Sequence, residues 1–210
     1  MILIDDKIQA SNAPAALKSP ALADVSEQAT FSITLAATEN IDAIGIGGTD
    51  ATTVTVNGQD ITYIENGLYM ITEITTGTLT VTHDGMYIGR LAAGKGRFLG
   101  AAPMREPGFY TTEEPRVTAS GQVVAGAGGY TGRSIGLDFR YKIDADIFDD
   151  FENAYASQIA KGFPFFLYFD KETHRMPWTR LYARTDNNLL FQSSVNRFLY
   201  SRRFDFSEAF

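Results

Sequence analysis

Apolar and polar residues alternate along two short segments of the N-terminal half of the chain. Residues 30–35 read Thr-Phe-Ser-Ile-Thr-Leu, and residues 53–56 read Thr-Val-Thr-Val. A period of two places the apolar side chains on one face of a strand, so both segments are predicted β-strands. Asn57-Gly58 follows the second segment and favours the positive φ angles of a two-residue type I′ turn. Residues 60–64 are the predicted returning strand of this hairpin.

Further strands are expected over the rest of residues 1–95. Residues 41–46 are almost continuously apolar and predict a more deeply buried strand, while residues 68–75 and 78–82 continue the alternation. Turn residues separate these segments. Strands that recur every 8–12 residues with turns between them are typical of an antiparallel sandwich. The pattern therefore predicts a β-sandwich over residues 1–95.

Residues 96–132 are rich in glycine and contain Pro103, Pro107 and Pro115. Residues 125–129, Ala-Gly-Ala-Gly-Gly, are too flexible for the interior of an element. We interpret this stretch as a flexible connector with short strands around residues 116–120, which is either a hinge or a loop that is ordered only against a neighbouring protein.

Residues 144–161 predict the one main helix. Five apolar residues recur there at helical spacing and form one stripe: Ile147, Phe148, Phe151, Tyr155 and Ile159. Aspartates fill the first turns, where negative charge complements the helix dipole, and Lys161 and Gly162 are typical of a helix C-terminus.

Residues 133–210 predict an α+β domain, because strand patterns surround this helix. The very apolar segment 163–169 is followed by predicted strands at 178–184, 188–192 and 198–206. Of the 26 aromatic residues of the chain, 18 lie between residues 139 and 210. The two halves thus differ in composition, which favours two folding units.

The net charge and the lack of cysteine argue against several classes of function for this chain. The net charge is −7, which argues against binding that depends on neutralising nucleic-acid phosphates. Residues 1–100 contain 5 Lys or Arg against 11 Asp or Glu, so the acidity lies in the N-terminal half. There is no cysteine and no apolar run of about 18 residues, which excludes thiolate metal sites and predicts no membrane insertion. The first residues lack the features of a secretory signal.

Candidate catalytic motifs are weak throughout. Gly89, Gly94 and Lys95 have phosphate-loop spacing, but Gly96 stands where Ser or Thr is needed, and the glycines at 45–48 favour a tight turn. The adjacent carboxylates at 5–6, 113–114 and 149–150 are neighbours in sequence only, whereas glycoside hydrolysis needs acids opposed across a cleft. His83 and His174 are interpreted as solvated loop residues. We therefore expect no enzyme activity and no cofactor or metal.

Five residues of the C-terminal part are candidate interface residues. Arginine is enriched in interfaces because its forked donors and planar group bind and stack well, and the aromatic residues exceed what about 70 residues readily bury. The alternative is that the arginines lie on solvated strand faces and form ion pairs within the chain. The candidates are Trp178, Arg180, Arg184, Arg202 and Arg203.

The order of these motifs is similar to that in virion proteins of tailed bacteriophages. Residues 40–56, with a buried strand, a small-residue turn and a Thr/Val strand, resemble the core of galactose-binding-like jelly rolls, and residues 86–91 resemble the strand that closes such domains. The C-terminal part resembles a minor-tail or distal-tail domain. Its matching segments are residues 136–141, the predicted helix, and residues 164–170, 181–184 and 203–209.

The resemblance implies a mainly β protein, with an N-terminal jelly-roll-type sandwich and a C-terminal α+β tail-protein domain with one main helix. It implies a structural component of the virion tail or tail tip, assembled in the host cytoplasm. The expected partners are copies of the chain itself, in a closed ring such as a homohexamer, and neighbouring tail proteins. The alternative is a carbohydrate-binding module that recognises a host-surface glycan. An enzyme acting on cell-wall sugars is the third hypothesis.

Overall fold

The computed structural model describes residues 2–98, 104–111, 116–117, 123–124, 131–138, 164–168, 180–185 and 203–209. Strands predominate in these residues and helical structure is confined to two short segments, so the prediction of a mainly β protein is confirmed. The chain divides into two compact units that interleave along the sequence. Unit 1 comprises residues 1–102, 144–183 and 210, and unit 2 comprises residues 103–143 and 184–209.

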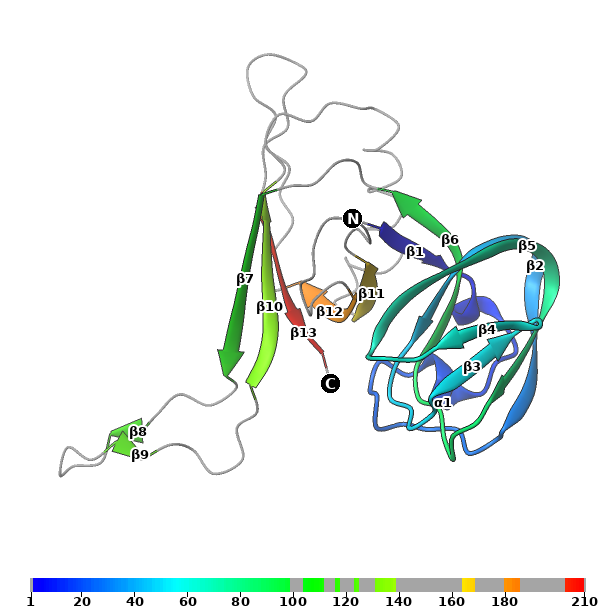
Figure 1. Cartoon of the computed structure of the whole chain (residues 1–210), viewed down its shortest axis with the longest axis horizontal. Helices are drawn as coiled ribbons and strands as arrows, with labels where there is room; N and C mark the ends of the chain where they lie inside the picture. The colour runs from blue at the N-terminus through cyan, green and yellow to red at the C-terminus, as the bar shows by residue number, and fades with distance from the viewer. Residues whose placement is uncertain are drawn as a thin grey trace, which may run out of the picture. The chain divides into compact units, whose positions relative to one another are not determined.

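Figure 1 labels the elements of both units. Unit 1 contains β1 (Ile2–Asp6), the 3-10 helix η1 (Ile8–Ala10), α1 (Ala15–Lys18), β2 (Thr30–Ile46), β3 (Thr53–Val56), β4 (Gln59–Thr62), β5 (Gly67–His83), β6 (Leu91–Phe98), β11 (Phe165–Tyr168) and the first residues of β12 (Arg180–Thr185). Unit 2 contains β7 (Met104–Thr111), β8 (Arg116–Val117), β9 (Val123–Val124), β10 (Thr131–Asp138) and β13 (Arg203–Glu208). The strand order is β4-β3-β5-β2-β6-β1-β11-β12 in unit 1 and β13-β10-β7 in unit 2.

Two strands of 17 residues each, β2 and β5, organise unit 1. Residues 30–34 of β2 pair with residues 78–82 of β5, and residues 43–46 pair with residues 67–70. The second half of β2 also pairs with residues 91–94 of β6. The two predicted strands at 30–35 and 41–46 are therefore parts of one strand, because β5 pairs with both.

The register between β2 and β5 shifts at two places, after Thr34 and after Ile41. Such irregularities bend a strand, and here they accompany a change in burial along β2. The first half alternates between buried and exposed residues, whereas the last four residues are all buried. The strands of unit 1 thereby enclose one apolar core. Its largest fully buried members include Ile8, Leu17, Ile33, Ile41, Ile44 and Ile46.

The predicted hairpin at Asn57-Gly58 is confirmed. These residues have φ angles of 46° and 80°, and β3 pairs with β4 on either side of them. Side chains then attach the hairpin to β5. The Gln59 amide donates to the Thr72 carbonyl oxygen and accepts from the Thr72 N–H, both at 2.9 Å, so it replaces a strand partner there.

The segment before β2 contains η1 and α1, which the sequence pattern did not predict. A buried ion pair holds this segment in place: Arg90 Nη2 donates to Asp6 Oδ2 at 2.8 Å, and the Asp6 side chain is 1% exposed. Asp6 Oδ1 also accepts from the Ile8 N–H at 2.9 Å, and Arg90 Nη1 donates to the Leu17 carbonyl oxygen at 3.3 Å. Burial raises the pKa of Asp6, and the Arg90 guanidinium acts in the opposite direction.

The aromatic strand predicted at 163–169 is present as β11, and all four of its residues are buried. It pairs with β1, where Ile2 lies opposite Tyr168. Phe166 packs over β2 at Gly45, where a Cβ atom would lie 2.6 Å from Cγ and 2.7 Å from Cε2 of the ring. Gly45 therefore leaves the space that the Phe166 ring occupies.

Unit 2 is an antiparallel sheet in which β10 lies between β7 and β13 (Figure 1). Thr131 lies opposite Thr111 at one end of the β7–β10 ladder, and β8 and β9 form a separate two-stranded ladder within residues 112–130. Glu208 joins β13 to β10, because its carboxylate accepts from both the backbone N–H and the guanidinium of Arg133.

Several predictions concern residues outside the described ranges. The helix at 144–161 and the strand at 188–192 are among them. Residues 96–132, expected to be a connector, include β7, β8 and β9. The jelly-roll form and the C-terminal domain with one main helix remain predictions.

Candidate functional site

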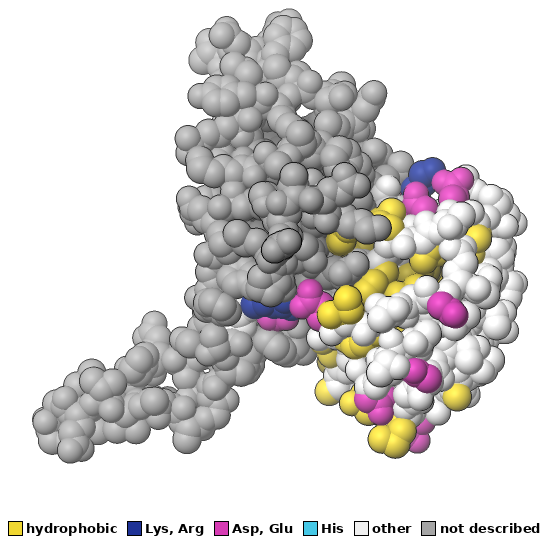
Figure 2. Space-filling model, viewed as in Figure 1, with side chains coloured by type: hydrophobic (Ala, Val, Ile, Leu, Met, Phe, Trp, Pro, Cys, Tyr) yellow, Lys and Arg dark blue, Asp and Glu magenta, His cyan; other side chains and the backbone are white. Residues whose placement is uncertain are grey.

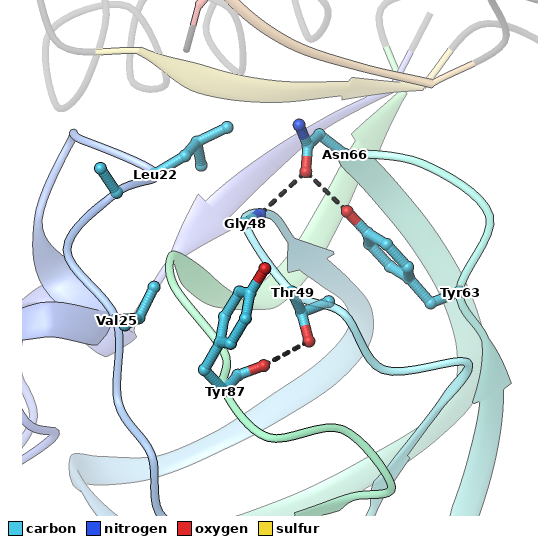
Figure 3. A pocket seen from close by; sticks show the side chains of 8 residues that line it. Leu22, Val25, Gly48, Thr49, Tyr63, Asn66 and Tyr87 are labelled. Atoms are coloured by element: carbon cyan, nitrogen blue, oxygen red, sulfur yellow. Dashed lines mark hydrogen bonds between the residues drawn. The ribbon is translucent and has the colours of Figure 1, made fainter.

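A pocket of about 450 Å³ lies in unit 1, beyond the C-terminal end of β2. Three loops and the segment after α1 form it. Figure 3 shows Leu22 and Val25 on one side, Tyr63 and Asn66 on the other, and Tyr87 between them. The complete lining is Leu22, Ala23, Val25, Gly48, Thr49, Tyr63, Asn66 and Tyr87.

Backbone hydrogen bonds bring the loops together. Gly48 has a φ of 63°, and a Cβ atom there would meet the Leu22 backbone, so both conformation and space require glycine. The Gly48 carbonyl oxygen accepts from the Gly89 N–H at 2.8 Å. Ser26 and Ile88 exchange two backbone hydrogen bonds, of 2.7 and 2.9 Å, which fix the segment that carries Leu22. The interpretation of the glycines at 45–48 as a tight turn holds for Gly48.

Most polar side-chain atoms of the pocket are used within it. Asn66 Oδ1 accepts from the Gly48 N–H at 2.8 Å and from the Tyr63 hydroxyl at 2.6 Å (Figure 3). The Thr49 hydroxyl donates to the Tyr87 carbonyl oxygen at 2.6 Å and accepts from the Ala51 N–H. Among the lining side chains, the Asn66 amide nitrogen and the Tyr87 hydroxyl are left for a ligand.

Tyr63 is held as a neutral hydrogen-bond donor. Burial raises the pKa of its hydroxyl strongly, and Tyr69 and Glu65 raise it further. Tyr69 fixes the same loop, because its hydroxyl donates to the Glu65 carbonyl oxygen at 2.6 Å and accepts from the Ile64 and Glu65 N–H groups. The pocket wall is therefore rigidly bonded on this side.

Exposed apolar side chains occur in the lining of the pocket and next to lining residues in the sequence. Val25, which lines it, is 37% exposed, while Ile64 and Met86, the chain neighbours of Tyr63 and Tyr87, are 70% and 75% exposed. Asp50 Oδ1 accepts from the Met86 N–H at 2.9 Å and so fixes the loop that carries Met86.

The surroundings of the pocket are acidic. Residues 19–89, which supply every lining residue, contain no Lys or Arg and nine Asp or Glu. Asp24, Asp50 and Glu65 are chain neighbours of lining residues. On the face of unit 1 seen in Figure 2, Asp and Glu side chains are spread over the surface.

The predicted interface residues that the structure describes do not line the pocket. Arg180 and Arg184 are in β12 and Arg203 is in β13, while Trp178 and Arg202 are outside the described ranges. Sequence reasoning missed the pocket because its residues come from three loops and the segment after α1, which are separate in the sequence. Tyr63 lies in the loop between β4 and β5 and Tyr87 in the loop between β5 and β6, and only their proximity in space shows that they belong to one site.

His83 corrects an interpretation made from sequence. It ends β5, but it is 5% exposed and not solvated: Nε2 is 2.8 Å from the Gln28 carbonyl oxygen, and the ring lies 6.5 Å from that of Phe31. Asp5 and Asp6 are neighbours with different partners, because the Asp5 carboxylate is 3.1 Å from Lys7 Nζ and Asp6 is paired with Arg90. Within the described residues no group of three or more His, Asp or Glu is placed to hold a metal ion.

The near-match to a phosphate loop forms a strand. Gly94 and Lys95 belong to β6, and Lys95 Nζ is 3.0 Å from Glu73 Oε2. In the part of the chain that the structure describes, no helix has the length and apolar character needed to cross a membrane. No protein-family model, curated protein or solved structure matches the chain.

Proposed function

We propose that the chain is a structural component of a bacteriophage tail or tail tip, which acts in the virion by assembling with copies of itself and with neighbouring tail proteins. The motif order described above supports this proposal, as does the mainly β architecture. The observation that carries it is the outer hairpin of unit 2, formed by β7 and β10.

In the strand order of unit 2, β7 is the last strand, and β10 is its partner among the described residues. An edge strand presents backbone N–H and C=O groups to which a strand of another chain can pair. Pro107 lies within β7, and proline in a sheet is typical of edge strands because it has no backbone N–H to donate to a ladder. The chain between β7 and β10 includes the β8–β9 ladder, and isolated two-stranded ladders are marginally stable in water. Assembly would supply strand partners for the backbone groups at the edge of β7 and for the β8–β9 ladder.

Sedimentation velocity on the purified full chain tests self-assembly, from low micromolar concentration upward. We expect a concentration-dependent shift from monomer to a discrete closed oligomer, visible as rings by negative-stain electron microscopy. Gold-labelled antibody against the chain is expected to mark the tails of intact particles. A strictly monomeric chain, together with unlabelled particles, refutes the proposal.

A second candidate function is recognition of a host glycan by unit 1. The pocket favours it, because tyrosine rings and an asparagine amide are common sugar-binding groups. Against it, most polar side-chain atoms of the pocket already bond to each other, and a sugar needs many hydrogen bonds. Calorimetric titration of the full chain with host polysaccharide fragments tests this function. Heat that disappears in a Tyr87→Ala variant supports glycan binding, and its absence leaves the assembly function alone.

A further inference from the structure

We propose that the pocket of unit 1 binds a small organic cation whose charge lies on an alkylated nitrogen, such as a trimethylammonium group. Three properties of the pocket carry this inference: its tyrosine rings, its negative potential and the shortage of free hydrogen-bond acceptors among its side chains. The inference goes beyond the proposed function, because it assigns a ligand to unit 1 and does not depend on assembly.

Tyrosine rings and aliphatic side chains line the pocket together. Figure 3 shows Tyr87 between the side that carries Tyr63 and the side that carries Leu22, so a ligand that fills the pocket contacts the Tyr87 ring. The face of an aromatic ring is negative and attracts a cation, while Leu22 and Val25 can contact the alkyl groups. A volume of about 450 Å³ lies within the usual range of small-molecule sites, which is about 300–1,000 Å³.

Carboxylates give the pocket a negative potential. Asp50 Oδ1 accepts from the Tyr87 N–H at 3.2 Å, which fixes one carboxylate at the backbone of a lining residue. Burial raises the pKa of Tyr63 most, and the charges of Tyr69 and Glu65 raise it further. The field of the Glu65 carboxylate therefore reaches the Tyr63 hydroxyl on the pocket wall.

The basic side chains that the structure describes in unit 1 do not offset this potential. None of them lines the pocket, and residues 19–89 contain no Lys or Arg. The basic residues at either end of that segment have partners elsewhere: Lys18 Nζ donates to the Ser11 carbonyl oxygen at 3.1 Å, and Arg90 is paired with Asp6. The pocket therefore favours a cation over an anion.

The hydrogen bonds within the pocket favour an alkylated cation over a primary ammonium. A primary ammonium has three N–H groups to satisfy, whereas a trimethylammonium group has none. Asn66 Oδ1 already accepts from two donors, and the Thr49 hydroxyl both donates and accepts. Of the two polar side-chain groups left for a ligand, only the Tyr87 hydroxyl can accept a hydrogen bond. A primary ammonium would therefore lose hydrogen bonds to water that these side chains do not replace.

Three small alcohols separate the parts of this inference. Choline carries a trimethylammonium group, ethanolamine carries a primary ammonium, and 3,3-dimethylbutan-1-ol is the neutral isostere of choline. Each is titrated into the full chain, and the amide chemical shifts measured by nuclear magnetic resonance give its dissociation constant. We expect choline to bind with a dissociation constant on the order of 1 mM, and the other two alcohols to bind at least about tenfold more weakly.

Matched variants locate the binding. Tyr87→Ala removes the ring and is expected to weaken choline binding by about 3- to 30-fold, whereas Tyr87→Phe keeps a ring and is expected to change it by less than about twofold. Asp50→Asn keeps an oxygen that can accept from the Tyr87 N–H but removes the charge, so it is expected to weaken binding by about two- to fourfold. Asp60→Asn, at an exposed position of β4 outside the pocket, is the control for the loss of one negative charge. Circular dichroism and the melting temperature show whether each variant is folded.

Choline binding that Tyr87→Ala weakens and Tyr87→Phe retains supports the inference. A folded wild-type chain that does not bind choline at about 50 mM overturns it. Equal affinity for the neutral isostere or for ethanolamine also overturns it, as does binding of a saccharide without binding of choline. None of these results bears on self-assembly, which sedimentation velocity tests separately.

Co-sedimentation with phosphatidylcholine vesicles then distinguishes two sources of the group. Vesicle binding that choline competes away assigns the pocket to a lipid headgroup, and choline binding without vesicle binding assigns it to a soluble ligand. Either result supports the inference.

Discussion

Replacing Gly45 by alanine tests the packing of β11 on β2, a contact between segments about 120 residues apart in the chain. The added Cβ atom would lie 2.6–2.7 Å from atoms of the Phe166 ring, well inside normal contact distance. Overpacking of this kind costs about 1–3 kcal/mol. Alanine also lowers the entropy of the unfolded chain, which offsets about 0.4–1 kcal/mol of that cost. The expected net loss of stability is about 1–2 kcal/mol.

The assay is urea unfolding followed by far-ultraviolet circular dichroism, with thermal melts in parallel. For a chain of this size the loss corresponds to a melting temperature lower by about 2–8 °C. Gly77→Ala is the matched control, because a Cβ atom there would have the Thr38 hydroxyl 3.5 Å away, an ordinary contact. We expect this variant to be as stable as wild type, or more stable by up to about 1 kcal/mol.

A double-mutant cycle ties the effect to the ring. Phe166→Ala alone is expected to cost about 3–5 kcal/mol. In the Gly45→Ala/Phe166→Ala variant the clash is absent, so its loss is expected to be about 1–2 kcal/mol smaller than the sum of the single losses. Strict additivity, or a Gly45→Ala variant as stable as wild type, would refute the packing of β11 over Gly45.

Three further predictions concern polar groups of unit 1. Asp6→Ala leaves the Arg90 guanidinium buried without its partner, so urea unfolding is expected to show a free energy of unfolding lower by about 3–5 kcal/mol. The double variant Asp6→Ala/Arg90→Met is expected to recover much of this stability. A double variant that recovers none of it would contradict a buried ion pair. The Thr52 hydroxyl and backbone N–H groups hold the pKa of Asp84 below its usual range, so the stability that Asp84 contributes is present above the unfolded pKa and is lost as pH falls through the folded value. Thr52→Val is expected to raise that pKa toward its ordinary value, as measured by carboxyl nuclear magnetic resonance titration, and an unchanged pKa would count against the hydrogen bond. Tyr63→Phe removes a half-buried donor and is expected to cost about 0.5–1.5 kcal/mol. In wild type, ultraviolet titration should leave this tyrosine un-ionised until the protein unfolds in alkali, and early ionisation of all ten tyrosines would contradict its raised pKa.

Strand identity was predictable wherever neighbouring residues decide it. The alternation at 30–35 and 53–56 and the Asn57-Gly58 turn all appear in the structure, because period and turn conformation depend on residues close in sequence. The length of β2 was not predictable in the same way. Nothing within the segment shows that β5 and β6 pair with its second half and continue the strand through the irregularities.

The candidate site was least accessible to sequence reasoning. Tyr63, Asn66 and Tyr87 acquire their roles from Gly48 and Leu22, which lie 15 to 65 residues away along the chain. His83 was interpreted as solvated because a turn follows it, yet Phe31 and the Gln28 carbonyl enclose its ring. Neither environment leaves a signal in the local pattern.

Composition, charge asymmetry, strand periodicity and turn chemistry are properties that residues carry with them, and they specified a mainly β chain with an acidic N-terminal half. The tertiary structure decided which strands pair, how β11 joins unit 1 through β1, and which side chains surround the pocket. The physical reason is that turns and periodicity reflect local conformational energies, whereas pairing and burial reflect the free energy of enclosing one core with segments distant in sequence.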